Sequence, residues 1–454
     1  MSHMELCKKV LRSAEKLGAK EAEALIVVRH AIGVEIERAE IKTCSDIVDG
    51  GLGVRTITNQ KIGFAFTNIL TQKEAEKTAK RAVEASKASP KDKNWKKLPE
   101  KRRYPTVRDT YDKKITRFTS DEAVALCQTM ISTAYEVDKR VLPAFGGAQV
   151  TIFESVCLNS HGVKASDRGT SLVCSLGTMA RSKTQVSPVC FEFKASRRYE
   201  PDPEWVAEEA ARLAIEAVNV GKAEAGRFPI LLDPFALQSI LTYTLVQSVK
   251  GDIVARGRSI FKNKIGKKIA GENITIYDNG TLPGGLNSGK MDMEGVPRQK
   301  TPIIEEGILR GFLYNNYWAR LEGKESTGNA GRGGGGLSLP PYGTIPTISP
   351  TNIQLKAGTF TEEELLEEVK NGYYVRSVQG AHQSNPETGE FSVALAPAWR
   401  IQKGRITHAV KGVMIAGNAY DMLKKVSALG KEARQVGTFI APKVVISELN
   451  VITE

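Results

Sequence analysis

Cysteine is scarce in this sequence and poorly placed for metal or disulfide chemistry. The chain has six cysteines in 454 residues, none of them in a CxxC pair and none after Cys190. Zinc ribbons and disulfide scaffolds need closely spaced or evenly distributed cysteines, so this distribution argues against both. We expect reduced, buried thiols in a cytoplasmic protein, because free cysteine is among the most buried residue types.

Histidine is scarcer still, with five residues in the chain. His3 belongs to an opening Met-Ser-His-Met that resembles a cloning remnant, so Met4 is the expected natural start. The other four lie far apart in the sequence, at His30, His161, His382 and His408. No two share a helical spacing, so no short-range zinc site is predicted. His382 lies in a polar segment, where we expect an ordinary loop histidine and hold a functional role as the alternative.

Long apolar runs and the common site motifs are also absent. No stretch of 18 or more apolar residues occurs, so no transmembrane helix is expected, and no basic start with an apolar core predicts a signal peptide. The sequence contains no HExxH, GxSxG or P-loop motif, and no GxGxxG that follows a strand. The composition, 41% hydrophobic and 25% charged, is that of an ordinary globular protein with two or three domains.

Positive charge is abundant but concentrated in one segment. The net charge is +13, and the stretch from Lys73 to Arg117 holds 16 Lys/Arg against 7 Asp/Glu. Part of it, SPKDKNWKKLPEKRRYP, has no helical or strand periodicity. We interpret it as a charged, solvated loop; the alternative is an acidic partner bound by a basic patch with interleaved Trp95 and Tyr104.

The order of expected elements favours an α+β fold in three regions. Residues 4–90 combine helices with an antiparallel hairpin, GLGVRTI–TNQK–IGFAFTN. Residues 91–222 follow with the basic loop, a helix, several strands and a second helix. Residues 223–454 are mostly strand and turn, which predicts a strand-rich domain of twisted antiparallel sheets.

Three helix starts are predicted from capping signals. Ser120 is the expected N-cap of a helix that runs to about residue 137. Asp233 is an N-cap followed by proline at the first helical position. Thr361 and Glu364 form a capping box for a short helix.

The second half resembles a known family in several ordered motifs. They include GDIVARGRSIFKNKIGKKI, EGVPRQKTPIIEEGILRGFLYNNYWAR, STGNAGR and VKGVMIAGNAYDML. These motifs resemble the TldD/TldE (PmbA) family, once called modulators of DNA gyrase. The likeness is strong over residues 221–454 and extends to the N-terminal hairpin. It implies a pair of cytoplasmic proteins in which TldD-like chains are zinc metallopeptidases.

The resemblance also assigns the family's site positions, and all of them are replaced. TldD-like chains carry HExxxH before a Gly-Asp pair and a third zinc ligand in a Cys-Gly-Lys segment. The two histidine positions correspond to Thr242 and Gln247, the base position to Tyr243 and the cysteine position to Leu429. Threonine and glutamine are poor zinc ligands and leucine is none, so no catalytic residue or metal is expected in this chain.

The hypothesis that follows is a TldE/PmbA-like, non-catalytic subunit of a dimeric zinc metalloprotease that degrades or processes unfolded peptides. The resemblance implies that a TldD-like partner supplies the zinc and that both chains enclose a chamber. Candidate peptide contacts are Tyr243, Asn329 and Arg332, and the glycine-rich segment TGNAGRGGGGLSLPPYG is a candidate chamber lining.

Two other functions stay open at this point. One is a DNA- or gyrase-associated protein that binds through residues 73–117, with Lys96, Lys97, Arg102 and Arg103 as its test positions; no recognition motif supports nucleic acid as a partner. The other is a metal-independent hydrolase or homodimer, since catalytic triads assemble in space and need no sequence signature.

Overall fold

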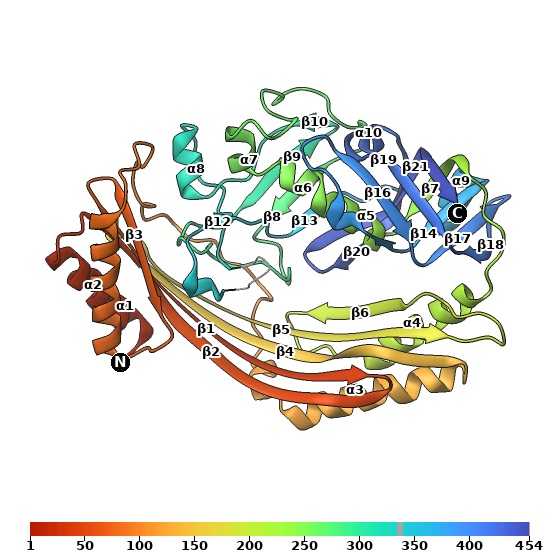
Figure 1. Cartoon of the computed structure of the whole chain (residues 1–454), viewed down its shortest axis with the longest axis horizontal. Helices are drawn as coiled ribbons and strands as arrows, with labels where there is room; N and C mark the ends of the chain where they lie inside the picture. Colours follow the sequence, from red (N-terminus) through yellow and green to blue (C-terminus); the bar gives the residue numbers. More distant parts are fainter. Residues whose placement is uncertain (334–338, 454) are drawn as a thin grey trace.

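The chain folds into a long curved sheet that lies beneath a strand-rich body (Figure 1). This computed structural model describes residues 1–333 and 339–453. Helices and mixed sheets confirm the predicted α+β class. No helix in the described part of the chain is both long and apolar enough to cross a membrane.

The curved sheet is antiparallel and has the strand order β3-β2-β1-β4-β5-β6. Its strands are β1 (Glu21–Glu37), β2 (Glu40–Thr58), β3 (Lys61–Thr67), β4 (Val141–Asn159), β5 (Lys164–Ala180) and β6 (Cys190–Ser196). The β2–β3 hairpin is the one that the sequence predicts. The central pair is β1 with β4, in register from Glu23 opposite Asn159 to Glu37 opposite Phe145. The first two sequence regions therefore build one sheet together, with three strands from each.

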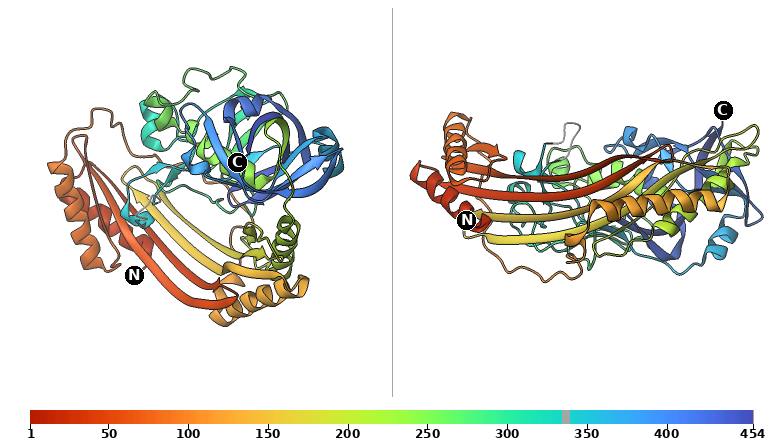
Figure 2. Two further views of the ribbon diagram at one scale, coloured as in Figure 1. Left: turned by 45° about the vertical axis from the view of Figure 1, so that its right-hand side comes forward. Right: turned by 90° about the horizontal axis from the view of Figure 1, so that it is seen from below.

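Four helices flank this sheet in two pairs. They are α1 (His3–Lys16), α2 (Gln72–Ala88), α3 (Ser120–Val137) and α4 (Pro203–Val218). Each region runs helix, three strands, helix, and α2 packs on β2 and β3 as α4 packs on β5 and β6. Figure 2 shows the pairs at opposite ends of the sheet. The N-cap of α3 is Thr119, not Ser120, because Thr119 is extended and its hydroxyl accepts from Glu122 N.

The C-terminal body is built on a 13-stranded sheet. Its early strands are β7 (Gly226–Leu232), β8 (Ile276–Asn279), β9 (Lys300–Glu305), β10 (Ile308–Leu309) and β13 (Ile353–Leu355). The later ones are β14 (Gly372–Val375), β15 (Val378–Gln379), β16 (Glu390–Leu395), β17 (Ala398–Gln402), β18 (Arg405–Val410), β19 (Val413–Asn418), β20 (Val426–Val436) and β21 (Phe439–Thr453). A small separate pair joins β11 (Ala330–Gly331) to β12 (Thr347–Ile348).

The sheet of this body is mixed, whereas the sequence predicted antiparallel sheets. Strand β14 runs parallel to β7, and β13 runs parallel to β21. The β7–β14 pair is joined by a long connection that contains other elements, which is the kind of link that parallel strands require. The helices of this body are α5 (Pro234–Tyr243), α6 (Leu245–Ser248), α7 (Gly251–Ala255), α8 (Asn316–Leu321), α9 (Glu362–Val369) and α10 (Ala419–Lys424).

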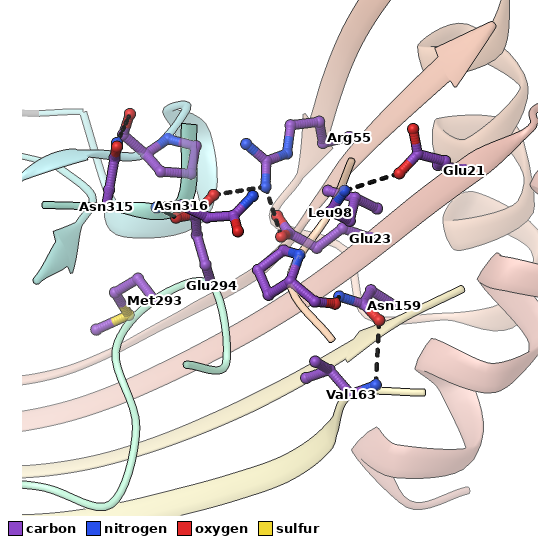
Figure 3. A network of polar contacts seen from close by, with 12 residues as sticks. Glu21, Glu23, Arg55, Leu98, Asn159, Val163, Met293, Glu294, Asn315 and Asn316 are labelled. Atoms are coloured by element: carbon purple, nitrogen blue, oxygen red, sulfur yellow. Dashed lines mark hydrogen bonds and ion pairs between the residues drawn. The ribbon is translucent and has the colours of Figure 1, made fainter. Parts of the chain in front are cut away.

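A buried ion network joins the curved sheet to the C-terminal body (Figure 3). The Arg55 guanidinium donates to Glu23 at 2.7 Å and to Glu294 at 2.8 Å. The second oxygen of Glu294 accepts from the backbone N–H of Asn316 at 2.9 Å. Arg332 pairs with Glu23 from the other side, so two arginines balance two glutamates where water is excluded.

Asp292 lies beside this network and carries a perturbed carboxyl. It accepts backbone N–H bonds from Glu294, Val296 and Ala330, each at 2.9 Å. Burial and the neighbouring Glu294 carboxylate nevertheless raise the pKa of Asp292 to about 7. Desolvation thus outweighs three hydrogen bonds at this position.

Candidate functional site

The helix that carries the replaced ligand positions is broken inside the motif. Asp233 caps α5 by accepting from Phe235 N, as predicted, and the helix ends at Tyr243. Thr244 then has φ −120° and ψ −89°, and its hydroxyl donates to the carbonyl of Ile240 at 2.7 Å. A short second helix, α6, continues the chain to Ser248.

Across the break, the second histidine position contacts the backbone of the first. Five residues of unbroken helix would place two side chains about 140° apart around the axis. Here the Gln247 side chain reaches back, and its Nε2 donates to the Thr242 carbonyl at 2.9 Å. The Gln247 side chain therefore lies against the backbone of Thr242.

The groups at these positions are already engaged within the chain. Lys250 Nζ donates to Gln247 Oε1 at 2.7 Å, and Gln238 Nε2 donates to Thr242 Oγ1 at 3.2 Å. Burial lowers the pKa of Lys250, because desolvation disfavours its charged form. The sequence analysis missed Lys250; a cation directly before the Gly-Asp pair is the signal that could have found it.

The third ligand position is occupied by the apolar side chain of Leu429. Leu429 lies on β20 opposite Val444 of β21 and is 5% exposed. It belongs to the same buried cluster as Leu237 and Leu241 of α5. The family position thus lies in one core with the α5 helix, but no donor atom is present there.

Zinc does not fit this set of residues. A hydroxyl, an amide bound at both ends and a leucine replace the imidazole and thiolate ligands that zinc prefers. Over residues 1–333 and 339–453, no group of three or more His, Cys, Asp or Glu side chains lies close enough to hold a metal ion.

Tyr243 is the accessible member of the three predicted peptide contacts. Its residue is 42% exposed at the end of α5. Its ring meets the His382 ring edge-on, with centroids 6.4 Å apart. His382 lies in the short 3₁₀ turn Ala381–Gln383 and is exposed, as the sequence predicted. The pair offers one aromatic face and one imidazole beside the broken helix.

Asn329 and Arg332 have a different setting from the one predicted. Asn329 is 1% exposed, and its amide donates to Asp278 at 2.6 Å and to the Ser349 carbonyl at 3.2 Å. Arg332 is held in the buried ion network. Both side chains stabilise the interior and present no free group to a peptide. Of the predicted glycine-rich lining, residues 334–338 lie outside the described part of the chain.

The basic segment is anchored and not a freely solvated loop. Trp95 is 3% exposed, and its indole N–H donates to Glu21 of β1 at 2.8 Å. Arg102 donates to both oxygens of Glu325, at 2.9 and 3.1 Å. The solvated-loop interpretation is therefore wrong at Trp95, although Lys96 stays exposed. Burial of the Trp95 indole holds this part of the segment against the protein, although charged lysines flank it.

The fold and the altered motif together define a protein built on a metallopeptidase scaffold. Sequence profiles of the PmbA/TldA metallopeptidases match in three parts: domain 1 at residues 22–86, the central domain at 113–218 and the C-terminal domain at 225–453. The chain belongs to the TldD/PmbA metallopeptidase family, which confirms the resemblance found in the sequence.

Individual relatives match over nearly the whole chain. An uncharacterized protein of Methanocaldococcus jannaschii is 32% identical over 437 residues, covering 96% of this chain and 97% of the relative. A metalloprotease TldD homologue of Buchnera aphidicola is 26% identical over 414 residues, covering 88% and 83%. The crystal structure of TldE from Thermococcus kodakarensis superposes with a TM-score of 0.92 at 29% identity, covering 98% of this chain and 99% of that one.

Proposed function

We propose that this chain is the non-catalytic, TldE-like subunit of a heteromeric zinc metallopeptidase. The observation that carries the proposal is the state of the ligand positions. Gln247 has both ends of its amide bound inside the chain, and Leu429 offers no donor. A TldD-like partner with HExxxH then supplies the metal and the general base.

The similarity to an archaeal TldE supports the same assignment. That structure matches this chain from end to end, so no inserted domain sets the two apart. The family's metallopeptidase scaffold is kept while the ligand residues are replaced. A scaffold kept without its ligands fits a subunit that shapes a site completed by another chain.

The role of this chain is to hold extended, unfolded peptide segments near the partner's metal. Exposed strand edges bind such segments through main-chain hydrogen bonds, which do not depend on sequence. Tyr243 adds an exposed aromatic contact beside the broken helix. We therefore assign peptide positioning to this chain and cleavage to the partner.

The test uses this full chain and a TldD-like chain encoded in the same genome. Each is purified alone and after mixing, and zinc per chain is measured by elemental analysis. We expect about one zinc in the partner, none above background in this chain, a stable complex on gel filtration, and faster cleavage of an unfolded peptide by the mixture.

Two outcomes would refute the proposal. One is stoichiometric zinc in this chain alone. The other is a cleavage rate and product pattern of the partner that this chain leaves unchanged. A partner with its HExxxH glutamate replaced by glutamine is the matched control, because it should keep zinc and complex formation but lose cleavage in the mixture.

A further inference from the structure

A cavity of about 410 Å³ lies where the curved sheet meets the C-terminal body. We call it the junction pocket; its principal lining residues are Arg55, Trp95, Asp252, Tyr317, Trp318 and Ile345. They come from β2, the basic segment, α7, α8 and the chain just before β12. The volume is in the range of roughly 300–1,000 Å³ that small-molecule and side-chain sites occupy.

The walls of the junction pocket are largely apolar and include three aromatic rings. The rings of Trp95 and Tyr317 lie 6.3 Å apart between centroids, and those of Tyr317 and Trp318 lie 5.2 Å apart at 85°. Arg256 covers the face of Trp318 at 5.1 Å. Ile345 is 55% exposed, a large apolar side chain left in water. Such a lining favours a bulky apolar or aromatic group.

The lining of the pocket carries charges of both signs. It contains Asp92, Asp252 and Arg256, while the charge of Arg55 is already balanced by Glu23 and Glu294. Two carboxylates against the guanidinium of Arg256 give an anionic ligand no net attraction. A side chain without negative charge is therefore favoured.

Two polar atoms of this lining have no hydrogen-bond partner. They are Arg55 Nε, a donor, and Asp252 Oδ1, an acceptor, and both are buried. Arg55 is 5% exposed, and its terminal nitrogen is held by Glu23 and Glu294. Unpaired buried groups are costly, so a ligand that pairs with them after a small side-chain rotation gains affinity.

A peptide unit has the matching chemistry, because each residue of an extended chain offers one N–H donor and one carbonyl acceptor. We infer that the junction pocket binds a bulky apolar or aromatic side chain of an extended peptide, with the adjoining peptide unit paired to Arg55 Nε and Asp252 Oδ1. The inference rests on the proposed peptide-holding function and names the substrate feature that this chain selects.

The test measures binding to the full chain alone, without a peptidase partner. The probes are two fluorescent heptapeptides with blocked termini, identical except for phenylalanine or serine at the centre. We expect the phenylalanine peptide to bind about tenfold or more tightly than the serine peptide, since burying one phenylalanine stabilises by more than the 1.4 kcal/mol that a factor of ten requires.

Ile345→Glu places a charge in the apolar mouth of the pocket and should weaken the phenylalanine peptide about tenfold or more. Ile345→Ala should weaken binding of the phenylalanine peptide less, in the same direction. Because this change is milder, it still tests the pocket if Ile345→Glu fails to fold. Ile406→Glu is the matched control: Ile406 is 42% exposed on β18, outside the pocket, and binding should stay unchanged.

Equal affinity for the two peptides, or wild-type affinity in Ile345→Glu, would overturn the inference. The proposed function fails separately. If the chain binds phenylalanine peptides at this pocket but never changes a partner's cleavage, the pocket stands and the subunit role falls. If it stimulates cleavage while Ile345→Glu binds and acts as wild type, the subunit role stands and the pocket falls.

Discussion

Replacing Arg55 by methionine should destabilise the protein severely. The change keeps most of the side chain's length but removes the cation from the buried ion network. Glu23 keeps Arg332 as its partner, whereas Glu294 keeps only the backbone N–H of Asn316. The network changes from neutral to one net negative charge, next to the buried carboxyl of Asp292.

The magnitude follows from the burial of the partners. Glu294 is 0% exposed and Arg55 5% exposed. Removing one partner of a buried pair typically costs about 3–5 kcal/mol, because the other charge is left uncompensated. Domains have a total stability of roughly 5–15 kcal/mol, so this loss is a large part of it.

Urea unfolding followed by circular dichroism measures the effect. At pH 8 we expect a fall of about 3–5 kcal/mol in the free energy of unfolding. At pH 5.5 the deficit should shrink, because Asp292, whose pKa is about 7, is then protonated and no longer adds a second negative charge beside Glu294. Arg102→Met is the matched control: its pair with Glu325 is solvent-exposed, and such pairs contribute under about 1 kcal/mol. A loss in Arg55→Met no larger than in Arg102→Met would refute the reasoning.

Three further predictions concern other buried or exposed sites. Between about pH 4 and pH 7 the folded state holds a proton on Asp292 that the unfolded chain has released. The free energy of unfolding should therefore fall as pH rises through that window. In urea titrations, Asp292→Asn should flatten this dependence on pH. Gly63→Ala should cost about 1–3 kcal/mol in the same assay, because the new Cβ would lie 2.1 Å from the Ala82 carbonyl of α2; a neutral result would contradict the packing described. Iodoacetamide should add one label to the native protein, at Cys44, since the other five cysteines are buried; mass spectrometry showing a second rapid adduct would disprove that arrangement.

Local features of the fold could be predicted from the sequence because their causes are local. The Thr361 and Glu364 capping box starts α9 as expected, and Asp233 starts α5. The β2–β3 hairpin follows from alternating strands around a short turn. These elements depend on residues within a few positions of one another, which one sequence displays directly.

Long-range features could not be predicted in the same way. The pairing of β1 with β4 joins residues more than a hundred positions apart, and Arg55 meets Glu294 across 239 positions. At the site, the resemblance identified which positions are replaced. It did not predict the helix break at Thr244, because no proline or glycine marks that position. It also did not predict the contact of Lys250 with Gln247.

The sharing of one sheet by two sequence regions has a consequence for synthesis of the chain. Strand β1 has 17 residues and its partner β4 ends only at Asn159. During synthesis, one edge of β1 therefore stays unpaired until β4 has left the ribosome. Unpaired strand edges of this kind recruit strands of other chains. Pairing over this separation raises the contact order and slows folding. The stage most exposed to aggregation is then the interval between completion of α2 and emergence of β4.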